Sequence, residues 1–225
     1  MPFDTYSSLL TSIDNYLGQR VELQPIYPDF VYLAEQRMYR DVRAREMIRR
    51  AVALLNETWE WLPFDFLQMR RVTVRDGSTG NIQPGPIRLT GMSTGQLEAS
   101  YANQAQSPLP EAYALEGLQI RFGPDLSTQT VPSGVVDPTP YRNFEVVYYA
   151  RFPHLNATDM PVTPMLQAYP ELFLYGALIE AEPYLVNDER LVVWKGVFDD
   201  AVESINRAAD FQASSALVMG MGSVP

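Results

Sequence analysis

The chain of 225 residues contains no cysteine, one histidine and one lysine. Without cysteine it has no disulfide, no thiolate nucleophile and no zinc–thiolate site. A Ser–His–Asp triad would depend on His154 alone, and no Gly-x-Ser-x-Gly motif supports one. One histidine also cannot form a histidine-rich metal site. We therefore expect His154 to have a packing or loop role, and the protein to have no catalytic residue, metal or cofactor.

Basic residues are outnumbered by acidic ones, so the formal net charge is −10 at pH 7. A protein that binds DNA or anionic membranes needs a basic face for phosphates, so this balance argues against both. No apolar run approaches the ~20 residues that span a bilayer, and the N-terminal stretch lacks the basic and apolar segments of a signal peptide. We expect no membrane partner and synthesis in a cytoplasm.

Apolar residues follow helical spacing at both ends of the chain. This spacing predicts a first helix from about Asp4 to Leu17. A second helix begins at Pro28 and is predicted to continue to about Asn56. Asp188 is a good N-cap for a last helix. The apolar face of that helix contains Leu191, Trp194, Val197 or Phe198, Ala201 or Val202, and Ile205.

Alternating apolar and β-branched residues dominate the middle of the chain. The stretches "FLQMRRVTV", "IRLT" and "FEVVYYARF" predict strands, and Glu116-Gly117 predicts the tight turn of a hairpin. Ser93 and Gln96 are placed as the capping box of a short helix. The stretch from Ser127 to Tyr141 is rich in Thr, Pro and Gly, which predicts an exposed loop.

Together these patterns predict the fold class α+β. We expect a helical bundle of long N-terminal and C-terminal helices with a small antiparallel β domain inserted between them. The expected domains are residues 1–62 with 163–212 as a discontinuous bundle, and residues 63–162 as the inserted β-rich domain. Residues 213–225 are expected to form a flexible C-terminal tail.

The stretch Tyr169–Leu185, "YPELFLYGALIEAEPYL", predicts a helix that is apolar on nearly all sides. Either it is the central helix of the bundle, or part of its outer side faces another subunit. Gly176 and Ala177 would allow close approach of another element in both cases. Glu180 and Glu182 lie in this helix, and a buried carboxylate needs an arginine or several other donors. We expect an interface salt bridge there in preference to catalysis.

Two further patterns carry little weight. Asp199 and Glu203 share a helix face, but a solvated face does not separate the pKa values of two carboxyl groups as acid–base catalysis requires. Gly220 and Gly222 have neither the preceding strand nor the following lysine of a phosphate loop.

Arginines are concentrated in "RDVRAREMIRRA", which contains Arg40, Arg43, Arg45, Arg49 and Arg50. One interpretation is a solvated helix face with pairs of opposite charge one turn apart. The other is a set of contacts to carboxylates of another subunit, because the chain has sixteen arginines and one lysine and the planar guanidinium suits fixed ion pairs better than an ammonium.

The stretch "YPELFLYGALIEAEPYLVNDERLVVWKGVFDDAVESIN", Tyr169 to Asn206, resembles the C-terminal signature of the head–tail adaptor (head completion, or connector) proteins of tailed bacteriophages. In that family a Tyr/His-Pro-Asp/Glu-Leu-Tyr/Phe-Leu-Tyr-Gly-Ala-Leu run leads into Pro-Tyr-Leu, an acidic turn and a helix with a tryptophan. The stretches "IYPDFVYLAEQRMYRDVRAREM", "LPFDFLQMRRVTV", "YALEGLQIRFGP" and "EVVYYARFPHL" follow in the family's order. They extend the resemblance over most of Pro25 to Asn206.

The resemblance implies a structural virion protein, located in the neck between head and tail, without enzymatic activity. Such subunits form a ring, typically of about twelve copies, that docks beneath the portal protein, extends the channel for DNA and receives the tail. The implied partners are the portal protein, a nozzle or other neck protein, further copies of the chain, and double-stranded DNA that passes without specific binding. Virions of this kind are assembled in the host cytoplasm.

Residue roles follow from the resemblance only as hypotheses. In several relatives the C-terminal tail reaches into the portal, so we assign the portal contact to Ala216, Leu217, Val218, Met219 and Met221. We assign ion pairs with a neighbouring subunit or the portal to Arg40, Arg43, Arg49, Arg50, Glu180 and Glu182.

Two alternatives remain open from the sequence. The chain is another ring protein of the neck, such as a tail terminator or a nozzle-like protein. In a different class, it is a small hydrolase or ligand-binding module that uses acids such as Glu180 and Glu182. An apolar pocket with converging polar groups would favour the second alternative.

Overall fold

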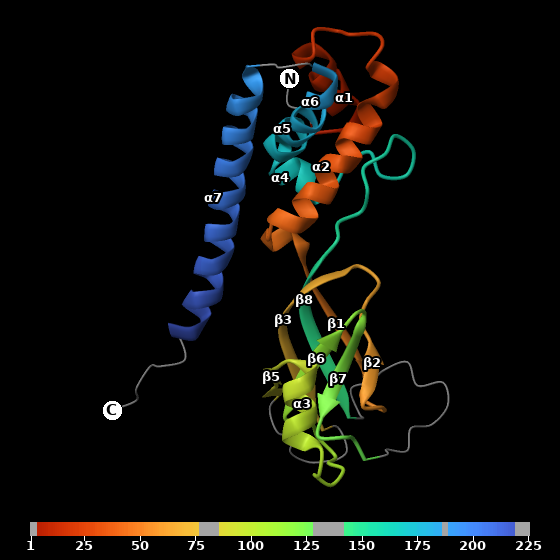
Figure 1. The fold of residues 1–225 in the computed structure, drawn as a ribbon, viewed down its shortest axis with the longest axis vertical. Coiled ribbons are helices and arrows are strands. Elements are labelled where there is room, and N and C mark those ends of the chain that lie inside the picture. The colour runs from red at the N-terminus through yellow and green to blue at the C-terminus, as the bar shows by residue number, and fades with distance from the viewer. Residues whose placement is uncertain (1–3, 77–85, 128–141, 186–188, 219–225) are drawn as a thin grey trace. The chain divides into compact units, whose positions relative to one another are not determined.

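The chain divides into two compact units in the computed structural model, which describes residues 4–76, 86–127, 142–185 and 189–218, with only the backbone for 210–218. Met1–Met47 and Arg151–Pro225 form one unit, and Ile48–Ala150 forms the other (Figure 1). We call them the helical unit and the β unit. These divisions lie earlier in the chain than the limits 62/63 and 162/163 expected from the sequence.

The helical unit contains α1 (Tyr6–Tyr16), α2 (Tyr27–Asp41), α4 (Pro164–Ala168), α5 (Pro170–Glu180), α6 (Glu182–Leu185) and α7 (Arg190–Val218), with short 3-10 turns at Gln24–Ile26 and Arg45–Met47. Local sequence sets most of the helix starts. The hydroxyl of Thr5 caps α1 in a capping box with Ser8. Pro28 and Asp29 lie in the first turn of α2, where a missing N–H and a negative charge are both favourable.

Helix α5 is the central helix of this unit, as the apolar stretch predicted. It packs against α2 and α7, and also against α1, α4 and α6. Gly176 lies where α5 approaches both α2 and α7 closely. A Cβ atom built on it would be 2.9 Å from Ala34 Cβ and 3.4 Å from Phe198 Cε2. The prediction that Gly176 permits close approach is therefore confirmed. In Figure 1, α2 and α7 run in the same direction on either side of α5.

Helix α7 buries one face, which includes Trp194, Phe198 and Ile205 of the predicted set. Val197 lies outside this face and is 37% exposed. The backbone of α7 stays helical to Val218, which includes the first residues of the expected flexible tail. Residues 219–225, the predicted N-cap Asp188 and most of the loop expected at Ser127–Tyr141 lie outside the described residues.

The β unit consists of two four-stranded sheets and one helix. The first sheet has the order β1 (Ile48–Leu54), β8 (Asn143–Ala150), β3 (Phe66–Arg75) and β4 (Ile87–Arg88). The second has the order β2 (Trp59–Trp61), β7 (Gln119–Gly123), β6 (Ala112–Glu116) and β5 (Thr90–Gly91), and α3 spans Thr94–Tyr101. The predicted capping box of α3 and the hairpin turn at Gly117, with φ +59°, are both present.

Side chains of both sheets form the core of the β unit. Val72 and Val74 of β3 and Phe144 and Val146 of β8 belong to one buried cluster with residues of the second sheet. The rings of Phe122 and Phe144 meet at 5.2 Å in a T-shaped arrangement. The alternation of β8 places these apolar residues on one face, which is why its sequence predicted a strand.

The predicted fold class is wrong in two respects. The helix expected from Pro28 to about Asn56 ends at Asp41, and Val42 is extended with φ −100° and ψ 137°. Five residues lie between Val42 and Ile48, so these two apolar residues do not fall on one helical period. Strand β1 follows and pairs with β8 along its whole length, which satisfies its backbone hydrogen bonds in a sheet.

The β part is also neither small nor wholly antiparallel. It occupies Ile48–Ala150, and β5 pairs with β6 in parallel. The structure is a mixed α+β fold instead of long terminal helices around a small β insertion. Among the described residues, none of the helices is both long enough and apolar enough to cross a membrane.

Candidate interaction surfaces

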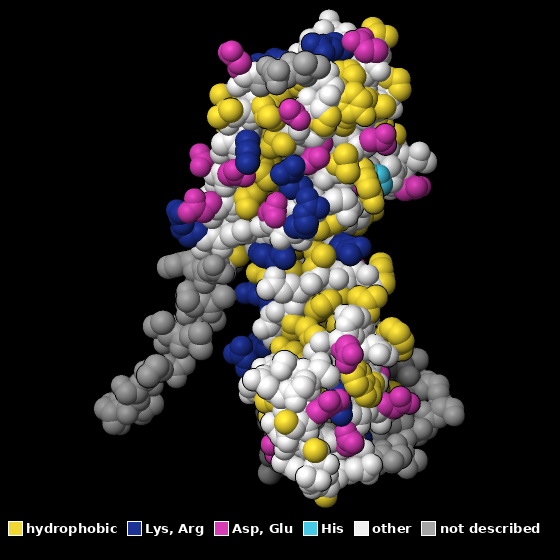
Figure 2. Space-filling view, in the orientation of Figure 1, with side chains coloured by type: hydrophobic (Ala, Val, Ile, Leu, Met, Phe, Trp, Pro, Cys, Tyr) yellow, Lys and Arg dark blue, Asp and Glu magenta, His cyan; other side chains and the backbone are white. Residues whose placement is uncertain are grey.

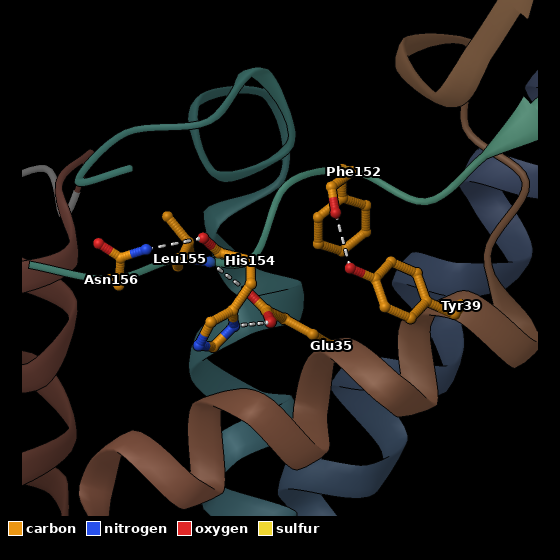
Figure 3. A network of polar contacts seen from close by, with 6 residues as sticks. All are labelled: Glu35, Tyr39, Phe152, His154, Leu155 and Asn156. Atoms are coloured by element: carbon orange, nitrogen blue, oxygen red, sulfur yellow. Dashed lines mark hydrogen bonds and ion pairs between the residues drawn. The ribbon is translucent and has the colours of Figure 1, made fainter. Parts of the chain in front are cut away.

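A buried carboxylate, Glu35, joins α2 to the chain segment that follows β8 (Figure 3). Its Oε2 lies 2.5 Å from Nδ1 of His154, and its Oε1 accepts a hydrogen bond of 2.9 Å from the N–H of Leu155. One turn along α2, the hydroxyl of Tyr39 donates to the carbonyl oxygen of Phe152 at 2.7 Å. These bonds give the only histidine a structural role in a loop.

Burial raises the pKa of Glu35, whereas the bonds from His154 and Leu155 oppose the rise. The pKa of this carboxyl group is near 4.5 in the unfolded chain and higher in the folded protein. The folded protein therefore holds this proton more tightly, and the group stabilises the fold less as pH rises from the unfolded-state pKa through the folded-state pKa. We expect the free energy of unfolding of the native protein to fall relative to that of Glu35→Gln over this range. Urea titrations of both proteins between pH 4.5 and pH 7 measure the difference. A difference that is independent of pH would contradict this role of Glu35.

Glu180 is held within its own subunit. Arg37 of α2 donates from Nε and from Nη2 to Glu180 Oε1, at 2.8 and 2.6 Å. The same guanidinium lies 6.0 Å from the centre of the Phe198 ring, so Arg37 connects α2, α5 and α7. From the sequence, Glu180 was predicted to need an arginine, but Arg37 was not identified as that partner. Glu182, the other acid of this stretch, is half-buried in α6.

The arginine-rich stretch is divided between the two units instead of lying on one helix face. Arg40 lies in the last turn of α2, is exposed and has no ion-pair partner among the residues that the structure describes. Arg43 donates to the carbonyl oxygens of Tyr39 and Val42 at the end of α2. Arg45 pairs with Glu46 at 2.8 Å.

The other two predicted arginines belong to β1. Arg49 is exposed, whereas Arg50 pairs with Glu145 of β8 at 2.7 Å. Arg71 of β3 binds the second oxygen of Glu145 at 3.3 Å. The hydrogen bond from Arg50, together with the charges of both arginines, lowers the pKa of Glu145. The assigned ion pairs with other proteins stay predictions at all of these positions.

Two helix surfaces of the helical unit combine exposed apolar and charged residues. We call Val192, Val193, Gly196, Asp200 and Glu203 the α7 outer face, and Tyr32, Leu33, Gln36 and Arg40 the α2 outer face. Val192 is 78% exposed and Val193 64%, and Tyr32 and Leu33 are 49% and 44% exposed. Figure 2 shows acidic side chains along the outer side of α7. Exposed apolar groups of this kind mark contact sites more often than isolated surface residues do.

The β unit has its own exposed apolar surface. Phe64 is 93% exposed and Trp61 is 72% exposed, both near the end of β2. Trp61 also lines an apolar hollow of about 200 Å³ with Ala51, Ala53, Leu62, Pro63, Phe144 and Val146. β1 and β2 are edge strands of their sheets, so this surface lies where backbone groups are open to pairing.

Arg142 is a structural residue that the sequence did not predict. It is 4% exposed, and it donates to the carbonyl oxygens of Leu55 at 3.1 Å, Pro108 at 2.6 Å and Ser127 at 2.5 Å. Burial lowers the pKa of its guanidinium. Three connecting segments of the β unit are thereby fixed to the start of β8. No sequence pattern distinguishes this arginine from the exposed ones.

The proposed portal-contact residues are not placed by the structure. The side chains of Ala216, Leu217 and Val218 are not described, and Met219 and Met221 lie outside the described residues. Within the described part of the chain, no group of three His, Asp or Glu side chains is arranged to hold a metal ion.

Exposed apolar and charged side chains thus lie on the described surface of both units. Residues 4–220 match the family model of the SU10 adaptor protein. The chain therefore belongs to the SU10 adaptor family, a family of phage head–tail adaptors, and it is a structural component of a virion. The resemblance drawn from the sequence is confirmed. No curated protein was found to match the chain.

Proposed function

We propose that this adaptor forms a ring of about twelve copies beneath the portal protein. The ring extends the channel for DNA and provides the docking site for the tail or another neck protein. The observation that carries this proposal is the family match, which extends from residue 4 to residue 220. Exposed apolar surfaces on both units support it, because a subunit inside a ring needs contact areas for several neighbours. The proposed role is structural and requires no catalytic residue.

The net charge of −10 supports a channel through which DNA passes without binding. Acidic side chains on the channel wall would repel phosphates and keep DNA from adhering. A channel wall lined by the arginines near the end of α2 would contradict this part of the proposal.

We assign the portal contact to the C-terminal segment after Gln212, which begins with the last residues of α7. The test is co-sedimentation with the portal ring from the same source, using the full-length protein and a variant that ends at Gln212. We expect several copies of the full-length protein per portal, and loss or weakening of binding after truncation. Circular dichroism serves as the control that the shortened variant is folded.

Either of two results would contradict the proposal. Binding by the truncated protein at full strength would exclude the C-terminal segment as the portal contact. No binding by a folded full-length protein would exclude a position against the portal and favour a lower position in the neck.

A further inference from the structure

We propose that the α7 outer face of each subunit binds the α2 outer face of the next subunit around the ring. This inference rests on the proposed function, because it specifies the contact between copies. Both faces point away from α5, which lies between the two helices, so they cannot meet within one copy.

The level of each residue along the two helices is fixed by contacts within the subunit. Gly176 brings Ala34 of α2 and Phe198 of α7 to the same level, since both lie against it. Farther along, Asn206 donates to the carbonyl oxygen of Asp41 at 2.8 Å and accepts from the N–H of Arg43 at 2.7 Å. Both helices run in the same direction and rise about 1.5 Å per residue. The same difference in residue number therefore relates residues of equal height over this length of the two helices.

The heights of other residues along α2 and α7 follow from these contacts. Apolar residues of the two outer faces lie at one height, and charged residues of opposite sign lie at another. Gly196 is level with Tyr32 and Leu33, and Glu203 is level with Arg40. A Cβ atom on Gly196 would have no neighbour within 4 Å, so the glycine leaves a flat site beside the exposed valines. Apolar residues of one face therefore lie at the height of apolar residues of the other, and acids lie at the height of a base.

The same levels apply between copies of a closed ring. Neighbouring copies in a ring are related by rotation, without a shift along the ring axis. With α2 and α7 along that axis, residues that are level within one copy are level between neighbours. Tyr32 and Leu33 then pack on Gly196 and Val193, and Arg40 pairs with Asp200 and Glu203. This contact joins two different surfaces of identical subunits, the α2 outer face and the α7 outer face, so it is a head-to-tail contact. Repeated head-to-tail contacts generate a closed ring when the rotation between copies closes.

Charge complementarity supports a second copy as the occupant of the α7 outer face. Asp200 and Glu203, with Arg207 one turn beyond Glu203 on the same face, leave this end of the α7 outer face with a net negative charge, and Arg40 makes the corresponding end of the α2 outer face basic. Glu203 already pairs with Arg207 on the surface of α7, and it retains exposure of 69%. Arg40 has no ion-pair partner among the described residues, so its charge is available to a neighbour.

Cysteine cross-linking suits a test of this contact, because the chain has no cysteine of its own. The double variant Leu33→Cys/Gly196→Cys is assembled on the portal ring and treated with a short bis-maleimide. We expect a ladder of covalent multimers that extends toward the full ring. The matched control is Leu33→Cys/Arg207→Cys, whose second cysteine lies on the same face of α7 but several turns lower. It should give no ladder, and neither single variant should give products larger than dimers.

Electron microscopy of the same samples separates failure of this inference from failure of the proposed function. Rings without a ladder would show that another pair of surfaces makes the contact, while the adaptor function stands. Absence of rings in the unmodified protein with portal would overturn both.

Charge reversal gives a second measure: Arg40→Glu should weaken ring formation at moderate salt, and adding Glu203→Arg should restore it. Unchanged assembly of Arg40→Glu would contradict the assigned ion pair.

Discussion

Replacing Gly176 with leucine is expected to destabilise the helical unit by about 3 kcal/mol, because extra side-chain atoms at a packed contact force the neighbours apart. Even a first added carbon would lie 2.9 Å from Ala34 Cβ, closer than real Cβ atoms approach, and Ala34 is not a flexible side chain that can move aside. α5 would have to separate from α2, from α7 or from both. Denaturation by urea measures the loss, and hydrogen exchange should place it in these three helices.

Gly196→Leu is the matched control for this substitution. It lies in α7, where an added carbon meets nothing within 4 Å, and leucine favours a helix over glycine by just under 1 kcal/mol. The control should therefore equal or slightly exceed the unchanged protein in stability when measured on free subunits. Equal stability of the Gly176 and Gly196 variants would show that α5 does not pack closely between α2 and α7.

Replacing Arg142 with methionine is expected to destabilise the β unit by about 3 kcal/mol. Methionine fills much of the same volume but cannot donate, so the carbonyl oxygens of Leu55, Pro108 and Ser127 lose this donor. Arg142→Lys should recover only part of the loss, because a single ammonium on a shorter stem does not reproduce the planar guanidinium. Hydrogen exchange should show the loss in the β unit.

Arg49→Met is the control for Arg142→Met. Arg49 lies in the same unit, but it is exposed and has no ion-pair partner among the residues described. We expect its replacement to change the free energy of unfolding by no more than about 0.5 kcal/mol. A similarly small change for Arg142→Met would mean that water replaces the guanidinium without cost.

Features set by a few neighbouring residues could be predicted from the sequence. The capping box of Ser93 and Gln96, the helix start at Pro170 and the turn at Gly117 each depend on local geometry that those residues favour. The apolar composition of α5 likewise predicted its central position. The resemblance to phage head–tail adaptors was recognisable because the matching stretch runs from Tyr169 to Asn206 without interruption.

The end of α2 and the start of β1 could not be predicted in this way. Arginine and alanine are compatible with a helix at Arg49–Ala53, and only pairing with β8, far away in the sequence, makes this segment a strand. Glu35 did give a local signal, because it lies on the apolar face of α2 beside Val31, Ala34 and Met38. Its partners His154 and Leu155 come from a distant segment, so the sequence gave no indication of them.

Surface roles were the least predictable from the sequence. The predicted apolar face of the last helix already left out Val192 and Val193, which are among the most exposed apolar side chains of the described chain, but the sequence did not show what these valines would contact. Their exposure follows from the direction in which α7 packs on α5, which Gly176 and Phe198 determine. The concentration of arginines likewise suggested a single helix face, whereas the arginine-rich stretch is divided between the two units.

The most direct test of this account is electron microscopy of the portal ring mixed with the full-length protein. The account predicts a closed ring of about twelve copies on one end of the portal, with α7 of each copy against α2 of the next. Single copies scattered on the portal, or a portal without any bound protein, would contradict it.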